Sequence, residues 1–403
     1  METNAAEPAA RVPAATSAGP LETDTLIIGA GPSGLAMAAC LRNDGVPFII
    51  VEARDHVGYA WRNHYDRLHL HTVKDHSNLP YLRFPDYVEK YPSRQAVVDY
   101  LDAYARHFAI NPHFNEEVTS VRSADGLWET VTTANHYRSG RVVICTGYNR
   151  RPVIPSWPGQ ESFRGTIIHS AEYRNGRPYS GKRVLVVGIG NTGGEIAVDL
   201  HEYGAAAVHI CVRSPINVIP RDLWGMPAQV TGILLSKLPE PMAFFLSKRL
   251  ARMAMGDLSK YGIRWPDIGP AEHVTRHGRV PLIDIGTVAL IKKGVVKVVP
   301  AIDRITETGV VFANGEHHDY DALILATGYK AALDGFLECA AEVTDDRGYP
   351  VPPAGESSRR GLYFLGYVNP TTGLLRQIAI DAQRIAKDIA SQARAEHRGV
   401  SNV

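Results

Sequence analysis

Two glycine-rich stretches hold the residues of this sequence best suited to binding a phosphate. The first runs from Gly29 to Gly34 (GAGPSG), between an apolar run and an Ala/Leu-rich segment with helical spacing. In such a turn the first glycine allows a tight bend, the second lets a pyrophosphate approach, and the third allows close helix–strand packing. The helix N-terminus adds amide donors and partial positive charge. The stretch predicts a dinucleotide cradle made of Gly29, Gly31, Pro32, Ser33 and Gly34.

An acidic residue follows this cradle at the spacing that a ribose contact requires. Glu52 comes directly after the apolar run Phe48–Val51, about 20 residues beyond Gly31. A carboxylate there accepts hydrogen bonds from the two ribose hydroxyls and repels a 2′-phosphate. The first cradle is therefore expected to hold a dinucleotide with a free 2′-hydroxyl, such as FAD.

The second stretch repeats this arrangement with a base in place of the acid. It runs from Gly188 to Gly193 (GIGNTG), and Arg213 lies where the first unit has Glu52. A guanidinium can grip the 2′-phosphate of NADPH with paired hydrogen bonds, although a solvated surface charge is the alternative interpretation of Arg213. The predicted NADPH contacts are Gly188, Gly190, Asn191, Thr192, Gly193 and Arg213.

Between the two stretches lies a pattern, FRGTIIHSAEYR, that contains His169 and Tyr173. It resembles the FxGxxxHxxxY(K/R) signature of class B flavin-dependent monooxygenases, and a tyrosine at this position is typical of the flavin-containing branch. The chain is most similar to the YUCCA-type (indole-3-pyruvate) members. The resemblance covers nearly all of the sequence after the first twenty residues, including YDRLHLH, KRVLVVGIGNTGGEIAVDL and DALILATGYK.

This resemblance implies a mechanism. NADPH would reduce FAD, and reduced flavin would react with O2 to give a C4a-(hydro)peroxyflavin. Oxidative decarboxylation of a small 2-keto acid such as indole-3-pyruvate would follow. The alternatives are N- or S-oxygenation of a soft nucleophile, and a non-catalytic FAD/NADPH-binding regulator. A disulfide reductase is excluded because no cysteine pair is present.

The resemblance also implies roles for particular residues. His169 and Tyr173 would couple the inter-domain linker to NADP binding, although a packed linker explains them too. Relatives of the animal type carry an asparagine three residues before a lysine near the flavin, and His71 occupies that position before Lys74. The candidate catalytic residues are His71, His169 and Tyr173. The further candidate cofactor contacts are Trp61, Arg62, Thr327, Gly328, Tyr329 and Gly366.

These residues require a particular α/β framework. Each glycine stretch lies in a strand–turn–helix–strand pattern, which predicts two Rossmann-like dinucleotide-binding domains, with the NADP domain inserted into the FAD domain. A helix over residues 372–390 is expected to pack on the FAD domain. The expected parts are a disordered leader (1–22), an FAD domain (23–150 plus 331–403) and an NADPH domain (151–330) with a helical or irregular insertion at about 214–280.

Composition narrows the function classes. The chain has 403 residues, 45% of them apolar, and a net charge of +1, which argues against a nucleic-acid binder. No stretch reaches the roughly 20 apolar residues of a membrane span. The four cysteines and sixteen histidines show no metal-ligand spacing, and a cytoplasmic location is expected. The expected partners are a small-molecule substrate and O2, and nothing indicates an oligomeric state.

Overall fold

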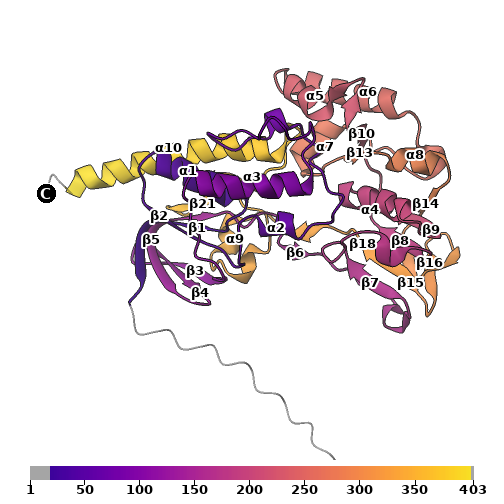
Figure 1. The fold of residues 1–403 in the computed structure, drawn as a ribbon, viewed down its shortest axis with the longest axis horizontal. Helices are drawn as coiled ribbons and strands as arrows, with labels where there is room; N and C mark the ends of the chain where they lie inside the picture. The colour runs from indigo at the N-terminus through magenta and orange to yellow at the C-terminus, as the bar shows by residue number, and fades with distance from the viewer. Residues whose placement is uncertain (1–18, 401–403) are drawn as a thin grey trace, which may run out of the picture.

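The computed structural model describes residues 19–400, which form two β-sheet units lying side by side (Figure 1). The first sheet is parallel at its centre, and an antiparallel hairpin continues it from its third strand. Its central order is β2 (Phe48–Val51), β1 (Leu21–Ile28), β5 (His136–Ile144), β21 (Leu362–Phe364) and β20 (Gly355–Glu356), and the hairpin is β3 (Val118–Ala124) and β4 (Leu127–Thr132).

Helices α1 (Pro32–Asn43), α3 (Arg94–His107) and α10 (Leu374–Val400) form one layer against this sheet (Figure 1). α1 is buried from Ser33 to Leu41 because α10 packs along it. The predicted C-terminal helix is therefore confirmed, and it runs ten residues past the expected end. Its apolar positions, spaced for one helical face, are buried: Leu375, Ile378, Ala382, Ile385 and Ile389.

The second sheet consists of five parallel strands. Their order is β14 (Val296–Val299), β9 (Ala207–Cys211), β8 (Arg183–Val187), β18 (Ala322–Leu325) and β7 (Thr166–His169). Helices α4 (Asn191–Glu202) and α8 (Thr287–Lys292) share one core with it. A second hydrophobic core lies between this sheet and a three-stranded sheet. The three-stranded sheet consists of β15 (Ile302–Ile305), β16 (Gly309–Phe312) and β17 (His317–Asp319). Both sheets thus have the helix-covered parallel form predicted from the glycine stretches.

The chain crosses twice between the two sheets, and the crossings pair with each other. β6 (Arg151–Pro152) and β19 (Tyr329–Lys330) form a two-stranded antiparallel sheet. The amide of Val153 donates to the carbonyl of Gly328 at 2.9 Å, and the Thr327 hydroxyl donates to the Val153 carbonyl at 2.5 Å. The Ala-Thr-Gly-Tyr stretch is therefore part of this crossing.

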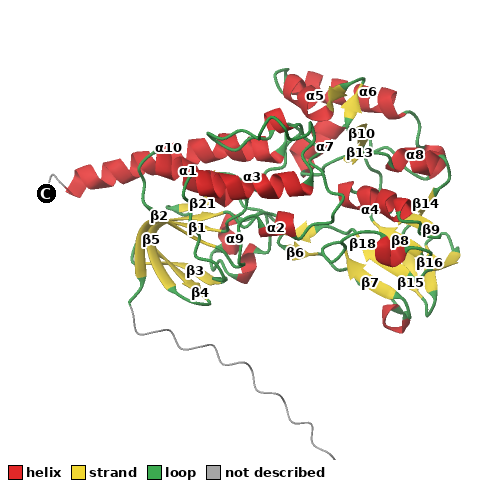
Figure 2. Cartoon of the chain, viewed as in Figure 1, coloured by secondary structure: helices red, strands yellow, loops and turns green. Residues whose placement is uncertain are grey.

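Residues 214–280, expected to be a helical or irregular insertion, contain three α-helices. They contain α5 (Ala228–Leu235), α6 (Glu240–Met255) and α7 (Pro270–His277), and the first two lie at the top of Figure 2. Short strands accompany them: β10 (Val218–Pro220), β11 (Asp222–Leu223), β12 (Met226–Pro227) and β13 (Leu282–Asp284). Pro239 is the N-cap of α6 and Pro241 lies in its first turn, so α6 begins at this pair of prolines. Within residues 19–400, every helix is too short or too polar to cross a bilayer.

The expected leader boundary at residue 22 is wrong by two residues. Residues 1–18 lie outside the described part of the chain. Leu21 and Glu22 already belong to β1, where they pair with Tyr137 and Arg138. The strand extends this far because β5 begins at His136 and offers backbone partners to both residues.

Candidate active site

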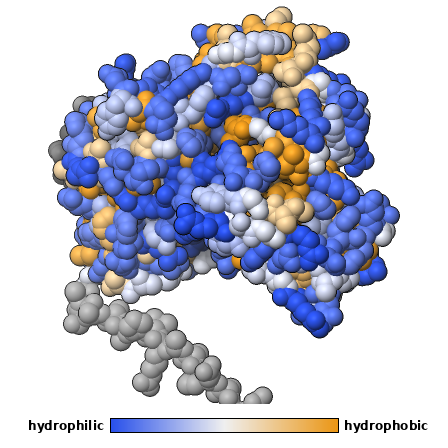
Figure 3. Space-filling model, turned by 45° about the vertical axis from the view of Figure 1, so that its right-hand side comes forward, coloured by the Kyte–Doolittle hydropathy of each residue, from blue (hydrophilic) through white to orange (hydrophobic). Residues whose placement is uncertain are grey.

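A cavity of about 1090 Å³ lies where the two sheets and the helical insertion meet. The first turns of α1 and α4 line it, so it lies at the carboxyl ends of β1 and β8, where parallel α/β sheets bind their ligands. α5, α6, α7 and the start of α10 complete its wall. Figure 3 shows apolar residues gathered in the middle of one face, below the helical part at the top.

The first glycine stretch has the geometry of a phosphate cradle. Gly29 has φ +103°, and a Cβ there would lie 2.9 Å from the Cys145 carbonyl oxygen. A Cβ on Gly34 would lie 1.8 Å from the Gly29 carbonyl oxygen, so this glycine serves helix packing and does not line the cavity. Gly31 faces open space, and α1 begins there without a side-chain cap. Free amides beside open space fit the pyrophosphate of a dinucleotide.

Glu52 lines the cavity beside this cradle. Its Oε2 accepts from the Ala30 amide at 2.7 Å and its Oε1 accepts from the Arg54 amide at 3.0 Å. Burial raises the pKa of the Glu52 carboxyl, while these amides oppose the shift. Each oxygen retains a lone pair for a ribose hydroxyl, so the carboxylate is held in place and able to bind.

The second stretch repeats this geometry. Gly188 has φ +112°, and a Cβ there would lie 2.5 Å from the Ala326 carbonyl oxygen. Gly190 faces open space at the uncapped start of α4, whereas Gly193 packs against Gly188. Of the six residues, Asn191 and Thr192 line the cavity. The Asn191 Oδ1 accepts from the Ile283 amide at 2.7 Å, which fixes the orientation of that side chain.

Arg213 lies two residues after the end of β9 and is exposed. It does not line the cavity, and no carboxylate of the described residues lies within ion-pair distance of it. An unpaired guanidinium at the carboxyl edge of the second sheet suits the outer end of a dinucleotide, where the 2′-phosphate lies.

Trp61 and Arg62 have different surroundings. Both belong to the short helix α2 (Tyr59–Arg62), and Trp61 lines the cavity. Arg62 does not line it; its guanidinium donates to the Val57 carbonyl and pairs with Asp102 of α3. The expected cofactor contact thus fits the geometry of Trp61, while Arg62 fastens α2 to α3.

Gly366 lies beside the first cradle and lines the cavity. It has φ +93°, and a Cβ there would lie 2.1 Å from the Ser33 Oγ. The hydroxyl of the next residue, Tyr367, lies 2.8 Å from Thr146 Oγ1. The end of β21 is therefore packed against the turn that opens α1.

His169 lies at the crossing between the sheets and is buried. Its Nδ1 accepts from the Ala171 amide at 3.1 Å, so Nε2 carries the proton and donates to the Gly328 carbonyl at 3.2 Å. Burial lowers the pKa of His169. Its ring meets that of Tyr329 edge-on at 5.0 Å. Tyr329 lines the cavity but His169, Thr327 and Gly328 do not, so His169 contacts the crossing and not the cavity.

Tyr173 is also buried away from the cavity. Its hydroxyl donates to Oδ2 of Asp199 in α4 at 2.6 Å, and its ring stacks on Tyr179. Burial, and then the Asp199 charge, raises the pKa of the Tyr173 phenol. The geometry joins the linker to the helix of the second cradle, which is a positioning arrangement rather than contact with a substrate.

His71, in contrast, lines the cavity and has a partner that the sequence analysis missed. Its Nε2 lies 2.6 Å from Oε1 of Glu195, a buried residue of α4. Lys74, three residues on, donates to the carbonyls of Asp86 and Val88 and stays outside the cavity. Only the fold brings residues 71 and 195 together, so spacing carried no signal for the pair.

Gln229 of α5 is a second residue that the sequence analysis missed. Its Nε2 donates to the carbonyls of Thr372 and His76, at 2.9 and 3.1 Å, and its Oε1 accepts from the Val73 amide at 2.9 Å. One buried side chain thus ties the insertion to two loops of the first unit. Its only sequence signal was its position in an apolar helix.

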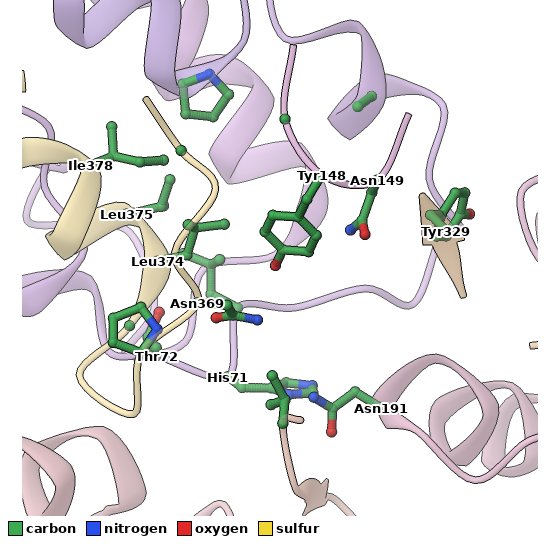
Figure 4. Close-up of a pocket in the computed structure, with 18 of the residues that line it drawn as sticks. His71, Thr72, Tyr148, Asn149, Asn191, Tyr329, Asn369, Leu374, Leu375 and Ile378 are labelled. Carbon is green, nitrogen blue, oxygen red and sulfur yellow. The ribbon is translucent and has the colours of Figure 1, made fainter. Parts of the chain in front are cut away.

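The remaining wall of the cavity combines apolar and amide side chains (Figure 4). Leu374, Leu375 and Ile378 of α10 form an apolar surface, and Asn369 lies beside them. Tyr148 and Asn149 project from the opposite side. Among residues 19–400, no group of three or more His, Cys, Asp or Glu side chains is arranged to hold a metal ion.

Two uncapped cradles that open on one cavity define the class of protein: a two-dinucleotide flavoprotein oxidoreductase. The family model described as "Flavin-binding monooxygenase-like" matches residues 23–387. The chain belongs to this family and is a flavin-dependent monooxygenase.

Curated plant proteins are similar to nearly the whole chain. It is 38% identical over 372 residues to the probable indole-3-pyruvate monooxygenase YUCCA4 of Arabidopsis thaliana, covering 91% of this chain and 90% of that protein. It is 37% identical to the indole-3-pyruvate monooxygenase YUCCA1 of Oryza sativa subsp. japonica, covering 94% of each. The resemblance to the YUCCA-type family is thus confirmed.

Solved structures share the fold. The flavin-containing monooxygenase of Stenotrophomonas maltophilia superposes with a TM-score of 0.71 at 22% identity, covering 93% of this chain and 99% of that one. Cyclohexanone monooxygenase from Rhodococcus sp. Phi1, bound to NADP+, superposes with a TM-score of 0.71 at 19% identity, covering 93% of this chain and 85% of that one. These matches confirm the expected fold class. The description of the family model supports a flavin as cofactor.

Proposed function

We propose that the chain uses NADPH and O2 to decarboxylate a small 2-keto acid of the indole-3-pyruvate type oxidatively. The observation that carries this proposal is the single cavity onto which both cradles open, with an apolar wall from α10. The printed names of the plant relatives supply the substrate class. An apolar wall suits an aromatic ring, which favours an aryl keto acid over a highly polar one.

Within this proposal, the first unit holds FAD and the second holds NADPH. Glu52 beside the first cradle suits a free ribose 2′-hydroxyl, and the unpaired Arg213 suits a 2′-phosphate. The proposed domain ranges are 23–150 plus 331–403 for FAD and 151–330 for NADPH, and the division of the strands between the two sheets supports this assignment. When bound, the flavin accepts hydride from NADPH and activates O2.

The protein's own contribution is to position and enclose the reactants. Trp61, Gly366 and Tyr329 line the cavity between the cradles, and α5–α7 cover it. Enclosure excludes water, which strengthens polar interactions in the site. The overall reaction converts the keto acid, O2, NADPH and a proton to the shortened acid, CO2, water and NADP+. One oxygen atom enters the acid and the other leaves as water.

The test uses purified, flavin-loaded protein with NADPH and 18O2. We expect indole-3-pyruvate to yield indole-3-acetate carrying one 18O atom, with one NADPH consumed per product. Phenylpyruvate and a tertiary amine serve as comparison substrates. Oxygenation of the amine without decarboxylation of either keto acid would overturn the assignment in favour of N-oxygenation. Peroxide as the only oxygen product with every substrate would overturn it entirely.

A further inference from the structure

A buried histidine–glutamate pair joins the two units at the wall of the cavity. His71 belongs to the loop after α2, and Glu195 belongs to α4, which the second cradle opens. Nε2 of His71 and Oε1 of Glu195 are 2.6 Å apart, and the side chains are 12% and 2% exposed. Both residues line the cavity. In Figure 4, His71 projects toward Asn191 at the start of α4.

The partner of Nε2 determines which ring nitrogen of His71 is left without a hydrogen-bond partner. A carboxylate only accepts hydrogen bonds, so Nε2 of His71 carries a proton. Nδ1 has no hydrogen-bond partner in the part of the chain that the structure describes. Nδ1 is therefore the atom that can accept a proton from, or donate one to, a group in the cavity.

Glu195 is held as an acceptor with capacity to spare. Its Oε2 is buried without a hydrogen-bond partner among the described residues. Burial, and then the charge of Glu195 and a hydrogen bond to it, raises the pKa of the neighbouring Tyr65 phenol well above 10, so the phenol stays neutral and is a donor beside Glu195. Among residues 19–400, no other carboxylate and no cation is hydrogen-bonded to either member of the pair.

We propose that Glu195 is a positioning residue, which holds His71 in the Nε2–H tautomer so that Nδ1 exchanges a proton with the reacting groups in the cavity. Neutral His71 takes up the proton that the reaction consumes at Nδ1, and the Glu195 carboxylate stabilises the resulting imidazolium. Nδ1 then donates this proton to the oxygen atom that leaves as water, and His71 returns to its neutral form. The proton-transfer role of His71 rests on the proposed function, whereas the assignment of its Nε2–H tautomer does not.

A second contact between the loop that carries His71 and α4 provides a matched control variant. Arg67, in the loop that carries His71, forms an ion pair with Glu202 at the other end of α4. Glu202→Gln therefore weakens a second contact between the loop and α4 without touching His71. Glu195→Met removes the acceptor at similar volume and leaves no buried charge.

The first measurement is the tautomer, read from 15N chemical shifts of 15N-histidine-labelled, flavin-loaded protein at about pH 8.5, well above the ordinary imidazole pKa. His71→Asn identifies the signals. We expect a protonated Nε2 and an unprotonated Nδ1 in the wild type and in Glu202→Gln, and averaged shifts in Glu195→Met. A wild type protonated at Nδ1, or unchanged shifts in Glu195→Met, would overturn the proposal.

The second measurement is turnover with the keto acid. Because a positioned acid–base group contributes on the order of 100-fold or more, Glu195→Met should lower kcat by about that factor. The KM for NADPH should stay within about three-fold of the wild type, and Glu202→Gln should match the wild type in both. Averaged shifts in Glu195→Met with unchanged kcat would overturn the proton-exchange role. Absence of product in the wild type would instead reject the proposed function and leave the tautomer result standing.

Discussion

At the scale of single residues, the site depends on a few side chains whose surroundings match their chemistry. Glu52 keeps both oxygens hydrogen-bonded to backbone amides and still lines the cavity. Arg213 is exposed and forms no ion pair with the described carboxylates. Under the proposed function, Glu52 is pre-positioned for a ribose and Arg213 is available for a phosphate.

The first prediction concerns Arg213. Arg213→Ala should raise the KM for NADPH about ten-fold or more, equivalent to at least about 1.4 kcal/mol, and leave NADH use nearly unchanged. The reason is that only NADPH carries the 2′-phosphate. Steady-state kinetics with both coenzymes provide the measurement. Arg183→Ala, which removes an arginine paired with Asp321 on the same sheet, serves as the control. Equal losses for both coenzymes would contradict the assignment.

The second prediction concerns Gly366. Gly366→Ala should release flavin and lower the free energy of unfolding by about 2–4 kcal/mol, because alanine is strained at φ +93° and its Cβ displaces Ser33 from the cradle. Flavin content after gel filtration and urea unfolding are the measurements. Gly348→Ala has a comparable φ of +78° and open space around it. That control should lose stability but keep its flavin; flavin loss in both variants would refute the local explanation.

At the scale of elements, the insertion is fastened to the first unit by specific contacts. Gln229 uses both of its amide donors and its carbonyl oxygen on two loops, and its Nε2 would lie 2.5 Å from a Cβ at Gly373. A Cβ on Gly232, also in α5, would lie 2.6 Å from the Thr371 carbonyl oxygen. Both glycines therefore permit close approach of α5 to the loop before α10.

The third prediction follows from this contact. Gln229→Leu leaves the Val73 amide and two carbonyls unpaired, which should lower the free energy of unfolding by about 2–4 kcal/mol. Hydrogen–deuterium exchange should quicken in residues 72–76 and 369–373. Ser236→Ala is the control, since that hydroxyl bonds only within its own helix, to Ile233. Unchanged exchange in both loops would show that α5 does not hold them.

At the scale of the whole molecule, a histidine at the cavity between the two units makes the free energy of unfolding depend on pH. His64 lines the cavity, and burial lowers its pKa to about 4, helped by Arg174 from the linker and by Arg94 from α3. Its pKa in the unfolded chain is about 6.5. As the pH falls, the unfolded state therefore binds a proton first. His64 is neutral in both states above pH 6.5, and between pH 6.5 and 4 its protonation in the unfolded state destabilises the fold.

The fourth prediction concerns this pH window. His64→Gln should remove a loss of stability on the order of 3 kcal/mol between pH 6.5 and 4, leaving a shallower dependence than in the wild type. Urea unfolding at several pH values measures it. Exposed His317→Gln is the control and should keep the wild-type slope. Parallel curves for His64→Gln and the wild type would contradict the shift.

The sequence by itself determined the two Rossmann-like units, the glycine cradles and the family. These features arise from local signals: glycines that permit a bend, apolar strands before them, and a charged residue at a set spacing. The C-terminal helix was predictable for the same reason, because its apolar positions repeat at helical spacing. Such patterns depend on residues close together in the sequence and can be recognised without knowledge of tertiary contacts.

The tertiary structure alone decided which of these residues reach the cavity. It buried His169 and Tyr173 behind the wall, turned Arg62 toward Asp102, and brought Glu195 to His71. It also decided between the helical and the irregular form expected for residues 214–280, and placed the helices α5, α6 and α7 over the site. These contacts join segments far apart in the chain, and their energies depend on packing and burial that spacing does not encode.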